Sequence, residues 1–442
     1  MLGKLLIASI LTGIISGFFI LLYEFLVIFM TRILFFGDPF KTIPTLPTWY
    51  LYLVPTVAIF IVNYLASLDK NIREYGINEI AESISKNEMT LKVKTLFLKV
   101  IASALSLGSG FLVGTEGPSA GIGAMIAYHI HKIFKLPTML IKMMISVGAS
   151  SGIAAIFVSP ITGISFAVEN IAYQFVKQYI SYLILASALA FAVTINYMEP
   201  IGFQHSSGKV FNNDYFIANL MFIPFITLFV FLYLFLKQRV LYLIDHKIFK
   251  KFYRFRNHIF ALIGGGVVGT ILLIEPHAAF SGKIIVMQLM NEDVQISVMF
   301  IFGIILLRII GTTVAIYANA VGGIFLPLMS IGALIGYGFA ELVSIYNFPV
   351  EPFYFAAIGA AVFMGVIMKL PLTAVVLAME TTFDYNVVIG TAISVILVEY
   401  FSSLYFTIRK SYVTKIYKIK EELATKKDMD TDKEKLEVKD KQ

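Results

Sequence analysis

Long apolar runs without a charged side chain dominate the chain. Residues 5–23 form a run of 19 such residues, and residues 216–236 form a run of 21. A helix needs about 20 apolar residues to cross the hydrocarbon core of a membrane. Further apolar segments lie near residues 53–67, 95–113, 118–131, 140–158, 179–195, 259–274, 296–318, 325–343, 353–368 and 386–407. The pattern predicts an all-α, polytopic membrane protein.

Many of these segments are interrupted by glycine, proline or serine, and several are too short to cross a bilayer alone. Broken helices are tolerated within a membrane only where protein buries them or where they line a cavity. The first run, residues 5–23, is too long for a signal peptide and no A-x-A cleavage site follows it, so we expect a retained span.

The composition agrees with a membrane protein, because 58% of the residues are hydrophobic and only 14% are charged. Soluble domains carry about 25% charged residues. Cysteine is absent, which excludes disulfides, thiolate metal sites and a cysteine nucleophile. The six histidines form no H-x-x-x-H pair. We therefore expect neither a metal site nor a cofactor.

Positive charge is concentrated in two segments. Residues 237–256 hold seven Lys/Arg and one Asp, and residues 409–442 hold eleven Lys/Arg and eight Asp/Glu. The positive-inside rule places both segments in the cytoplasm, and we expect both termini there. No stacking platform or reading motif accompanies the basic clusters, which argues against nucleic-acid binding. Trp49, beside two tyrosines, suits an interfacial aromatic belt.

The two halves of the chain repeat each other. "PSAGIGAMI" from Pro118 matches "PLMSIGALI" from Pro327 at an offset of 209 residues. "GASSGIAAIFVSPITGISFAVE" from Gly148 matches "GAAVFMGVIMKLPLTAVVLAME" from Gly359 at an offset of 211. An internal repeat with interrupted helices is typical of transporters, and it places the substrate near the membrane midplane, between the repeats. We expect a transmembrane domain over residues 1–408, with halves 1–200 and 201–408, and a charged cytoplasmic tail over 409–442.

Glu116 stands among glycines in the apolar stretch "GTEGPSAGIGAMI". Pro118 suits a first helical turn, so a helix should start at about residue 117 or 118 with its free amides directed back toward Glu116. "GGIFLP", residues 322–327, should start the matching helix of the second repeat. Helix N-termini attract anions. Two of them meeting near the midplane predict an anion site that binds weakly enough to release its ion.

Glu116 would then be a tethered anion at an anion site. Its carboxylate can occupy the amides that a permeating anion needs, and protonation removes that attraction. Burial favours the neutral form whereas helix amides favour the charged form. The alternative is a helix-capping glutamate at the membrane surface, which the surrounding apolar runs disfavour.

These motifs resemble those of the CLC family of chloride channels and chloride/proton antiporters. "GTEGP" is similar to the family's G-[KR]-E-G-P motif, "GGIFLP" to G-x-F-x-P, and "PITGISFAVE" and "PLTAVVLAMETTFDY" to its two P-[LI]-[TA]-[GA] helices. The similarity runs from about residue 10 to 415. It implies an inverted repeat of tilted and broken helices and a homodimer with one anion pathway per subunit in the cell membrane. Residues 409–442 are too few for the family's regulatory CBS domains.

The resemblance also implies roles for individual residues. Glu116 resembles the gating glutamate, and the amides of Ile324, Phe325 and Gly117 resemble anion ligands. Tyr412, in "RKSYVTKI", resembles the inner-gate tyrosine whose hydroxyl contacts the anion, although a plain interfacial tyrosine fits it too.

Three departures from the family pattern affect the interpretation. Thr115 replaces the usual Lys/Arg and lowers the positive charge at the site. The first anion-binding motif survives only as "EYGINEI", where Tyr75 takes the place of the anion-binding serine and can either donate its hydroxyl or face away. Asn170 stands where the internal proton-transfer glutamate is expected, and an amide does not titrate.

The leading hypothesis is a chloride-conducting protein gated by Glu116 with weak or absent proton coupling. One alternative is a chloride/proton antiporter whose protons bypass Asn170, for example through water, and another is a fluoride exporter. A cation-coupled symporter would use Glu169 and Glu380 as ligands, but a role as repeat-related helix-packing or capping carboxylates suits them better. An enzyme is disfavoured, because no His pair or Ser/His couple accompanies the carboxylates Glu380 and Asp384.

Overall fold

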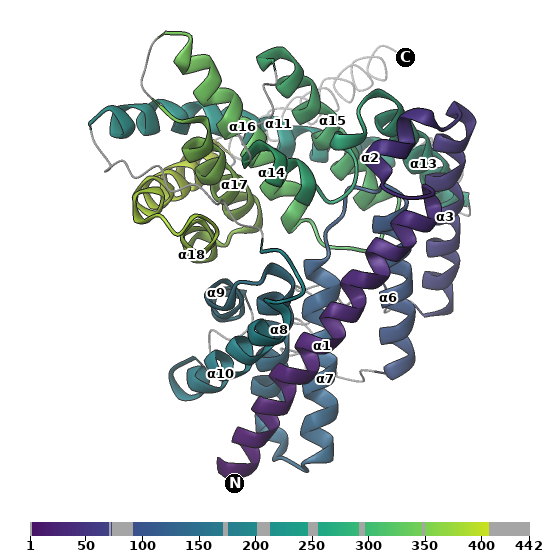
Figure 1. The fold of residues 1–442 in the computed structure, drawn as a ribbon, viewed down its shortest axis with the longest axis vertical. Coiled ribbons are helices and arrows are strands. Elements are labelled where there is room, and N and C mark those ends of the chain that lie inside the picture. Colours follow the sequence, from purple (N-terminus) through teal and green to yellow (C-terminus); the bar gives the residue numbers. More distant parts are fainter. Residues whose placement is uncertain are drawn as a thin grey trace, which may run out of the picture.

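The structure is a computed structural model that describes residues 2–69, 72, 92–170, 176–200, 213–245, 255–290, 297–346 and 350–405. Within these residues the regular elements are helices, joined at one point by an isolated β-bridge (Figure 1). The helices of the first half are α1 (Leu2–Leu34), α2 (Pro39–Thr42), η1 (Ile43–Thr45), α3 (Thr48–Leu68), α6 (Val93–Gly108), α7 (Glu116–Ile133), η2 (Thr138–Leu140), α8 (Ile141–Phe157), α9 (Pro160–Asn170) and α10 (Val176–Thr194). The second half holds α11 (Asn213–Asp245), α13 (Arg256–Ile274), η4 (Pro276–Ala278), α14 (Lys283–Met290), α15 (Val298–Tyr317), α16 (Phe325–Ser344), α17 (Pro352–Met368), α18 (Pro371–Thr382) and a last helix, Tyr385–Tyr405.

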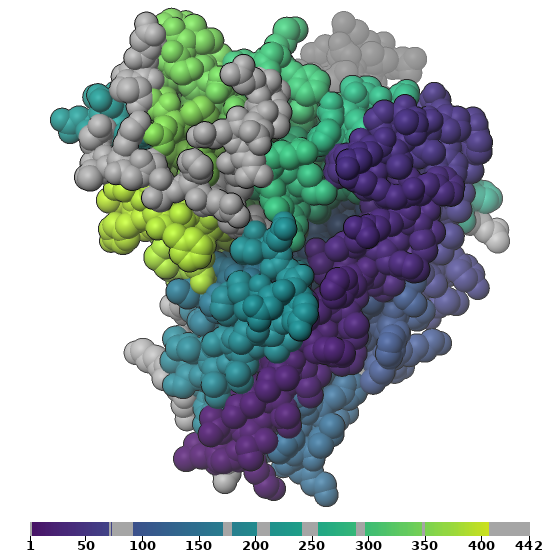
Figure 2. All heavy atoms as spheres, in the orientation of Figure 1, coloured from purple at the N-terminus to yellow at the C-terminus, as the bar shows by residue number. Residues whose placement is uncertain are grey.

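The described residues contain eight helical stretches that are long and apolar enough to cross a membrane. The stretches over Thr138–Phe157 and Phe325–Ser344 are 89% and 83% buried by protein, whereas the other six are half buried or less. Figure 2 shows α1 as a ridge across the surface, and its outward side chains are large and apolar, among them Phe25 and Phe29. The predicted all-α, multi-pass membrane architecture is confirmed.

The sequence repeat appears as two matching sets of three helices. In Figure 1, α7, α8 and α9 lie in the lower half and their counterparts α16, α17 and α18 lie in the upper half. Within each set the first two helices pack closely through glycine. A Cβ on Gly123 would lie 1.9 Å from the Gly148 carbonyl oxygen, and a Cβ on Gly332 would lie 2.1 Å from that of Gly359. Small residues let membrane helices approach this closely.

The second and third helices of each set are joined by the same sharp turn. Val158 directly follows the last residue of α8, and Lys369 directly follows the last residue of α17. Both residues have left-handed backbones, with φ of 52° and 59°. Two residues later, Pro160 and Pro371 begin α9 and α18. A left-handed residue ends a helix and proline suits the first turn of the next one, so the turn follows from local sequence in both repeats.

α1 continues beyond the apolar run that predicts it, and α14 lies in none of the predicted segments. α1 extends past residue 23 to Leu34, although Glu24 interrupts the run. The Glu24 carboxylate lies 3.6 Å from the Lys283 ammonium group at the start of α14. This ion pair reduces the cost of a charge within the helix.

Candidate functional site

The two repeats meet at a backbone crossing just before α7 and α16. The amide of Gly114 donates to the carbonyl of Gly323 at 2.7 Å, and the amide of Gly323 donates to the carbonyl of Gly114 at 2.8 Å. The two glycines are 209 residues apart, which is the offset of the first sequence repeat. Equivalent points of the two repeats are therefore in direct contact.

In both repeats a helix begins directly after the crossing. α7 begins at Glu116, close to the predicted start at residue 117 or 118, and α16 begins at Phe325. The first amides of a helix have no partner within the helix and carry its partial positive charge. Two such ends, set side by side by the glycine bridge, form an anion-attracting site without a cationic side chain.

The Glu116 carboxylate occupies this site. Its side chain is fully buried, and its Oε1 accepts a hydrogen bond of 2.5 Å from the Phe325 amide. Its Oε2 is buried and has no hydrogen-bond partner among the described residues. A buried carboxylate oxygen without a partner is costly, so the carboxylate is held here by one helix end and is only partly satisfied.

Two glycines make room for the carboxylate. A Cβ on Gly114 would lie 2.0 Å from Glu116 Oε2, and a Cβ on Gly323 would lie 2.1 Å from Oε1. Neither distance is compatible with a side chain, and at both positions the nearest atoms belong to Glu116 itself. Gly114 and Gly323 thus form the backbone bridge and also leave space for the Glu116 carboxylate.

Phe325 fixes the start of α16. Its ring is fully buried and packs against Phe157 at the end of α8, with 4.7 Å between the ring centroids. Because Phe157 belongs to the first repeat and Phe325 to the second, this contact sets the position of the Phe325 amide relative to Glu116.

The structure brings together four of the predicted site residues. Glu116 and Phe325 are hydrogen bonded, Ile324 is the residue immediately before α16, and Gly117 lies against the backbone of Gly323. The hydrogen bond at Glu116 involves the Phe325 amide, and none is recorded from the Ile324 amide. Tyr75 and Tyr412 lie outside the described residues.

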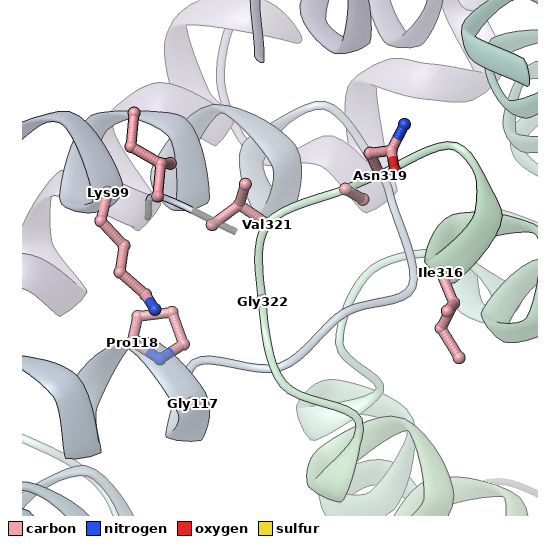
Figure 3. A pocket seen from close by; sticks show the side chains of 9 residues that line it. Lys99, Gly117, Pro118, Ile316, Asn319, Val321 and Gly322 are labelled. Atoms are coloured by element: carbon pink, nitrogen blue, oxygen red, sulfur yellow. The ribbon is translucent and has the colours of Figure 1, made fainter. Parts of the chain in front are cut away.

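A cavity of about 150 Å³ adjoins the crossing and α7. Its lining residues are Ile72, Lys99, Gly117, Pro118, Ile316, Asn319, Ala320, Val321 and Gly322. Figure 3 shows Lys99 reaching from α6 with its nitrogen directed toward Pro118. Lys99 was missed from sequence, although a lysine inside the apolar segment 95–113 was a signal, since charged residues within membrane segments usually have a function.

Asn170 is the last residue of α9 and is half-buried. The adjacent Glu169 carboxylate is engaged elsewhere, because it accepts hydrogen bonds from the Leu372 amide at 3.0 Å and from the Thr373 amide and hydroxyl at 2.9 and 2.7 Å. It therefore caps the start of α18. Glu169 is a capping carboxylate, as expected from the sequence.

Glu380 makes the reciprocal cap. It accepts hydrogen bonds from the Ile161 amide at 2.9 Å, from the Thr162 amide and hydroxyl at 2.5 and 2.7 Å, and from the Ser159 hydroxyl. Each of the two repeat-related helices thus caps the other with the same chemistry. A sodium site at these carboxylates is disfavoured, because amides and hydroxyls already use them.

Comparison with known proteins identifies the family. The family profile described as "Voltage gated chloride channel" matches residues 56–403. The "H(+)/Cl(-) exchange transporter ClcA" of Salmonella arizonae is 27% identical over 333 residues, which are 72% of this chain and 68% of that protein.

Two solved structures share the fold. One is described as a "slow cyanobacterial Cl-/H+ antiporter", with a TM-score of 0.78, 21% identity and coverage of 90% of this chain and 93% of that one. The other is described as a "CLC-type fluoride/proton antiporter", with a TM-score of 0.72, 18% identity and coverage of 90% and 95%.

Proposed function

The chain belongs to the voltage-gated chloride channel family, and we propose that it carries chloride across the membrane along a pathway gated by Glu116. The observation that carries this proposal is the hydrogen bond from the Phe325 amide to the Glu116 carboxylate. A carboxylate and a chloride ion compete for the same donors, because both are small anions that accept from backbone N–H groups. The pathway is then closed while the carboxylate holds the amide.

Protonation would open the pathway. A neutral carboxyl group loses its charge-assisted hydrogen bond to the amide, and the two helix ends no longer attract it. A permeating chloride can then take the amides of Phe325, Ile324 and Gly117, while the side chain turns away. Since protonation is favoured at low pH, chloride flux should rise as the pH falls.

We further propose that proton coupling is weak or absent. A coupled transporter must deliver a proton to Glu116 through apolar protein, and a titratable side chain would shorten that route. Asn170 does not titrate. Its neighbour Glu169 is held by two amides and a hydroxyl at the start of α18 and is not free to relay a proton.

Chloride/proton exchange is the second candidate, because the curated relative reported above is named an exchange transporter. In that case protons would bypass Asn170, through water or through a residue outside the described part of the chain. Glu116 would still be the group that meets both ions.

One experiment tests the proposal and separates the two candidates. Purified protein is reconstituted in liposomes with a chloride gradient, and external pH and chloride are recorded together. Chloride flux without proton movement supports the proposal, whereas uphill proton movement driven by chloride identifies an exchanger. Absence of chloride flux, with fluoride flux in a parallel sample, would replace chloride by fluoride as the substrate.

We propose that the protein acts as a homodimer with one pathway in each subunit and with both termini in the cytoplasm. The positive segment 237–256 supports this orientation through the positive-inside rule. Light scattering of the detergent-solubilised protein measures the oligomeric state, and labelling of a single cysteine introduced near residue 250 in the cysteine-free chain reports the side. A monomer, or labelling from outside intact cells, would contradict these statements.

A further inference from the structure

Two neighbouring cavities lie toward the end of α1 that is far from the N-terminus (Figure 1). One, of about 350 Å³, lies between α1, α2 and α14, and the other, of about 260 Å³, lies between α1, α14 and residues 197–199. Glu24, Ile28 and Lys283 line both, so the two cavities adjoin along α1 and are called the α1 groove below. Ligand pockets commonly have volumes of about 300–1,000 Å³, so the groove can hold part of a lipid-sized molecule.

The groove opens on an apolar face of α1. Phe25, Ile28 and Phe29 have 54%, 40% and 57% of their surface exposed, and they line a shallow hollow that continues the groove. The apolar face of a helix that crosses a membrane lies against lipid acyl chains and not against water. An acyl chain is therefore the occupant that suits this part of the groove.

The same end of α1 carries a marker of the level of the lipid headgroups. Tyr50 belongs to α3, and its hydroxyl donates to the carbonyl of Leu34, the last residue of α1, at 2.9 Å. The neighbouring Trp49 is exposed, and 5.7 Å separates the centroids of the two rings. Tryptophan and tyrosine are enriched where the hydrocarbon meets the headgroups. The groove therefore extends from the hydrocarbon up to the headgroups.

Charged side chains at the groove leave one cation and one carboxylate accessible. Glu24 and Lys283 lie 3.6 Å apart and neutralise each other. Arg32 is exposed, and its guanidinium group has no hydrogen-bond or ion-pair partner among the described residues. The Asp38 carboxylate accepts from the Phe40 amide at 3.2 Å and lies 4.0 Å from an exposed lysine outside the groove, and half of the Asp38 side chain remains exposed. Arg32 and Asp38 both line the larger cavity.

We propose that the α1 groove binds one phosphatidylethanolamine molecule, with its phosphate at Arg32, its ammonium group at Asp38 and an acyl chain over Ile28. A guanidinium group matches a phosphate in charge and in bidentate geometry. A primary ammonium group can donate to a carboxylate, whereas the quaternary ammonium of phosphatidylcholine has no N–H to donate. Phosphatidylglycerol carries no cation, so Asp38 would repel it. The inference goes beyond the proposed chloride transport and does not depend on it.

Native mass spectrometry of the full chain tests the proposal. The detergent-solubilised protein is offered phosphatidylethanolamine, phosphatidylglycerol and phosphatidylcholine with identical acyl chains, and we expect phosphatidylethanolamine to be retained most. Arg32→Gln should weaken binding of all three lipids by about threefold to fivefold, the size expected for one exposed ion pair. Asp38→Asn should instead abolish the preference for phosphatidylethanolamine over phosphatidylglycerol.

Lys4→Gln is the matched control, because it removes an exposed cation at the other end of the same helix and should leave lipid binding unchanged. Ile28→Trp fills the groove and should lower the binding of all three lipids whatever their headgroup. Equal retention of the three lipids by the wild type, a preference for phosphatidylglycerol, or unchanged phosphatidylethanolamine binding in Arg32→Gln would overturn the inference. Absence of chloride flux in the wild type would overturn the proposed function alone.

Discussion

Two contacts join the repeats, and both involve equivalent positions. At the first, Gly114 and Gly323 form a backbone bridge, and Glu116 lies opposite Phe325, its own equivalent at the offset of 209. At the second, α9 and α18 exchange caps through Glu169 and Glu380, at the offset of 211.

The exchanged caps keep the symmetry in three hydrogen bonds each, and Glu380 accepts one more from the Ser159 hydroxyl, whose equivalent is Leu370. Both carboxylates accept from two successive amides and from a threonine hydroxyl at the start of the opposite helix. Such a contact satisfies helix ends that would otherwise lack partners in a membrane. The first amides of both helices that the structure describes as donating here already donate to a carboxylate, so these amides are not available to a permeating ion.

At the crossing, only the backbone hydrogen bonds between Gly114 and Gly323 are symmetric, and the side chains that follow them differ. One repeat carries a glutamate and the other a phenylalanine, so a single carboxylate lies at the crossing. One of its oxygens accepts from the Phe325 amide, and the other lacks a partner among the described residues. The comparison indicates that the Glu169 and Glu380 caps stabilise the packing of the two repeats. The Glu116 carboxylate, opposite Phe325, keeps an oxygen without a hydrogen-bond partner among the described residues, and it is the group that can take part in transport.

Glu116→Gln removes the negative charge from the crossing, and of all the variants it should change chloride flux the most. A charge-assisted hydrogen bond contributes about 1.5–3 kcal/mol, and each 1.4 kcal/mol is about a tenfold change in an equilibrium. We therefore expect chloride flux at neutral pH to rise by about tenfold or more and its increase toward low pH to disappear. Flux in reconstituted liposomes across a pH series measures both. A variant that kept the wild-type pH profile would show that another group is the gate.

Gly114→Ala tests by steric displacement, and not by charge, whether the Glu116 carboxylate is the gate. The added methyl group collides with the Glu116 carboxylate, so it should displace the gate and raise flux nearly as much as Glu116→Gln. In the Glu116→Gln background it should add little, because the gate is already displaced. The comparison of single and double variants in the flux assay measures this.

Gly148→Ala is the contrasting variant. Its methyl group meets the Gly123 carbonyl oxygen, which belongs to the backbone and cannot swing away. It should reduce the yield of folded protein and leave the pH profile of the surviving fraction unchanged. If Gly114→Ala behaved in the same way, the glycine would be needed for packing and not for the gate.

Glu169→Gln and Glu380→Gln test the symmetric contact. Each variant loses a charged cap, and we expect each to destabilise the protein by about 1–2 kcal/mol, with similar values for the two. Thermal unfolding in detergent measures the loss, and exposed Glu199→Gln is the control. The pH profile of chloride flux should stay that of the wild type. A selective change of that profile in Glu169→Gln would assign this residue to the transport pathway.

Asn170→Glu is expected to give the smallest effect. It places a titratable group beside the Glu169 cap and should raise the ratio of protons to chloride ions from a value near zero. Asn170→Gln, which does not titrate, should leave the ratio unchanged. Simultaneous pH and chloride recordings measure it. A tight proton/chloride ratio in the unmutated protein would mean that protons reach Glu116 by another route.

The sequence by itself determined the class of fold, the repeat and most helix bounds. Apolar length predicts membrane helices, and the offsets of 209 and 211 paired α7 with α16 and α9 with α18 before any contact was known. Pro118 marked the start of α7, because proline acts through its own backbone. Glu116 could be singled out for the same local reason, as a carboxylate just before a helix in an apolar stretch.

Only the tertiary structure decided which groups meet. The sequence repeat predicted that the helix starts near Glu116 and Phe325 meet, but only the packed structure showed that the Phe325 amide is the donor to Glu116 and that Glu169 accepts from Thr373. The same holds for Lys99, whose neighbours Gly117 and Val321 come from two other segments. Local chemistry follows from local sequence, whereas a site shared by two repeats depends on how their buried surfaces fit together.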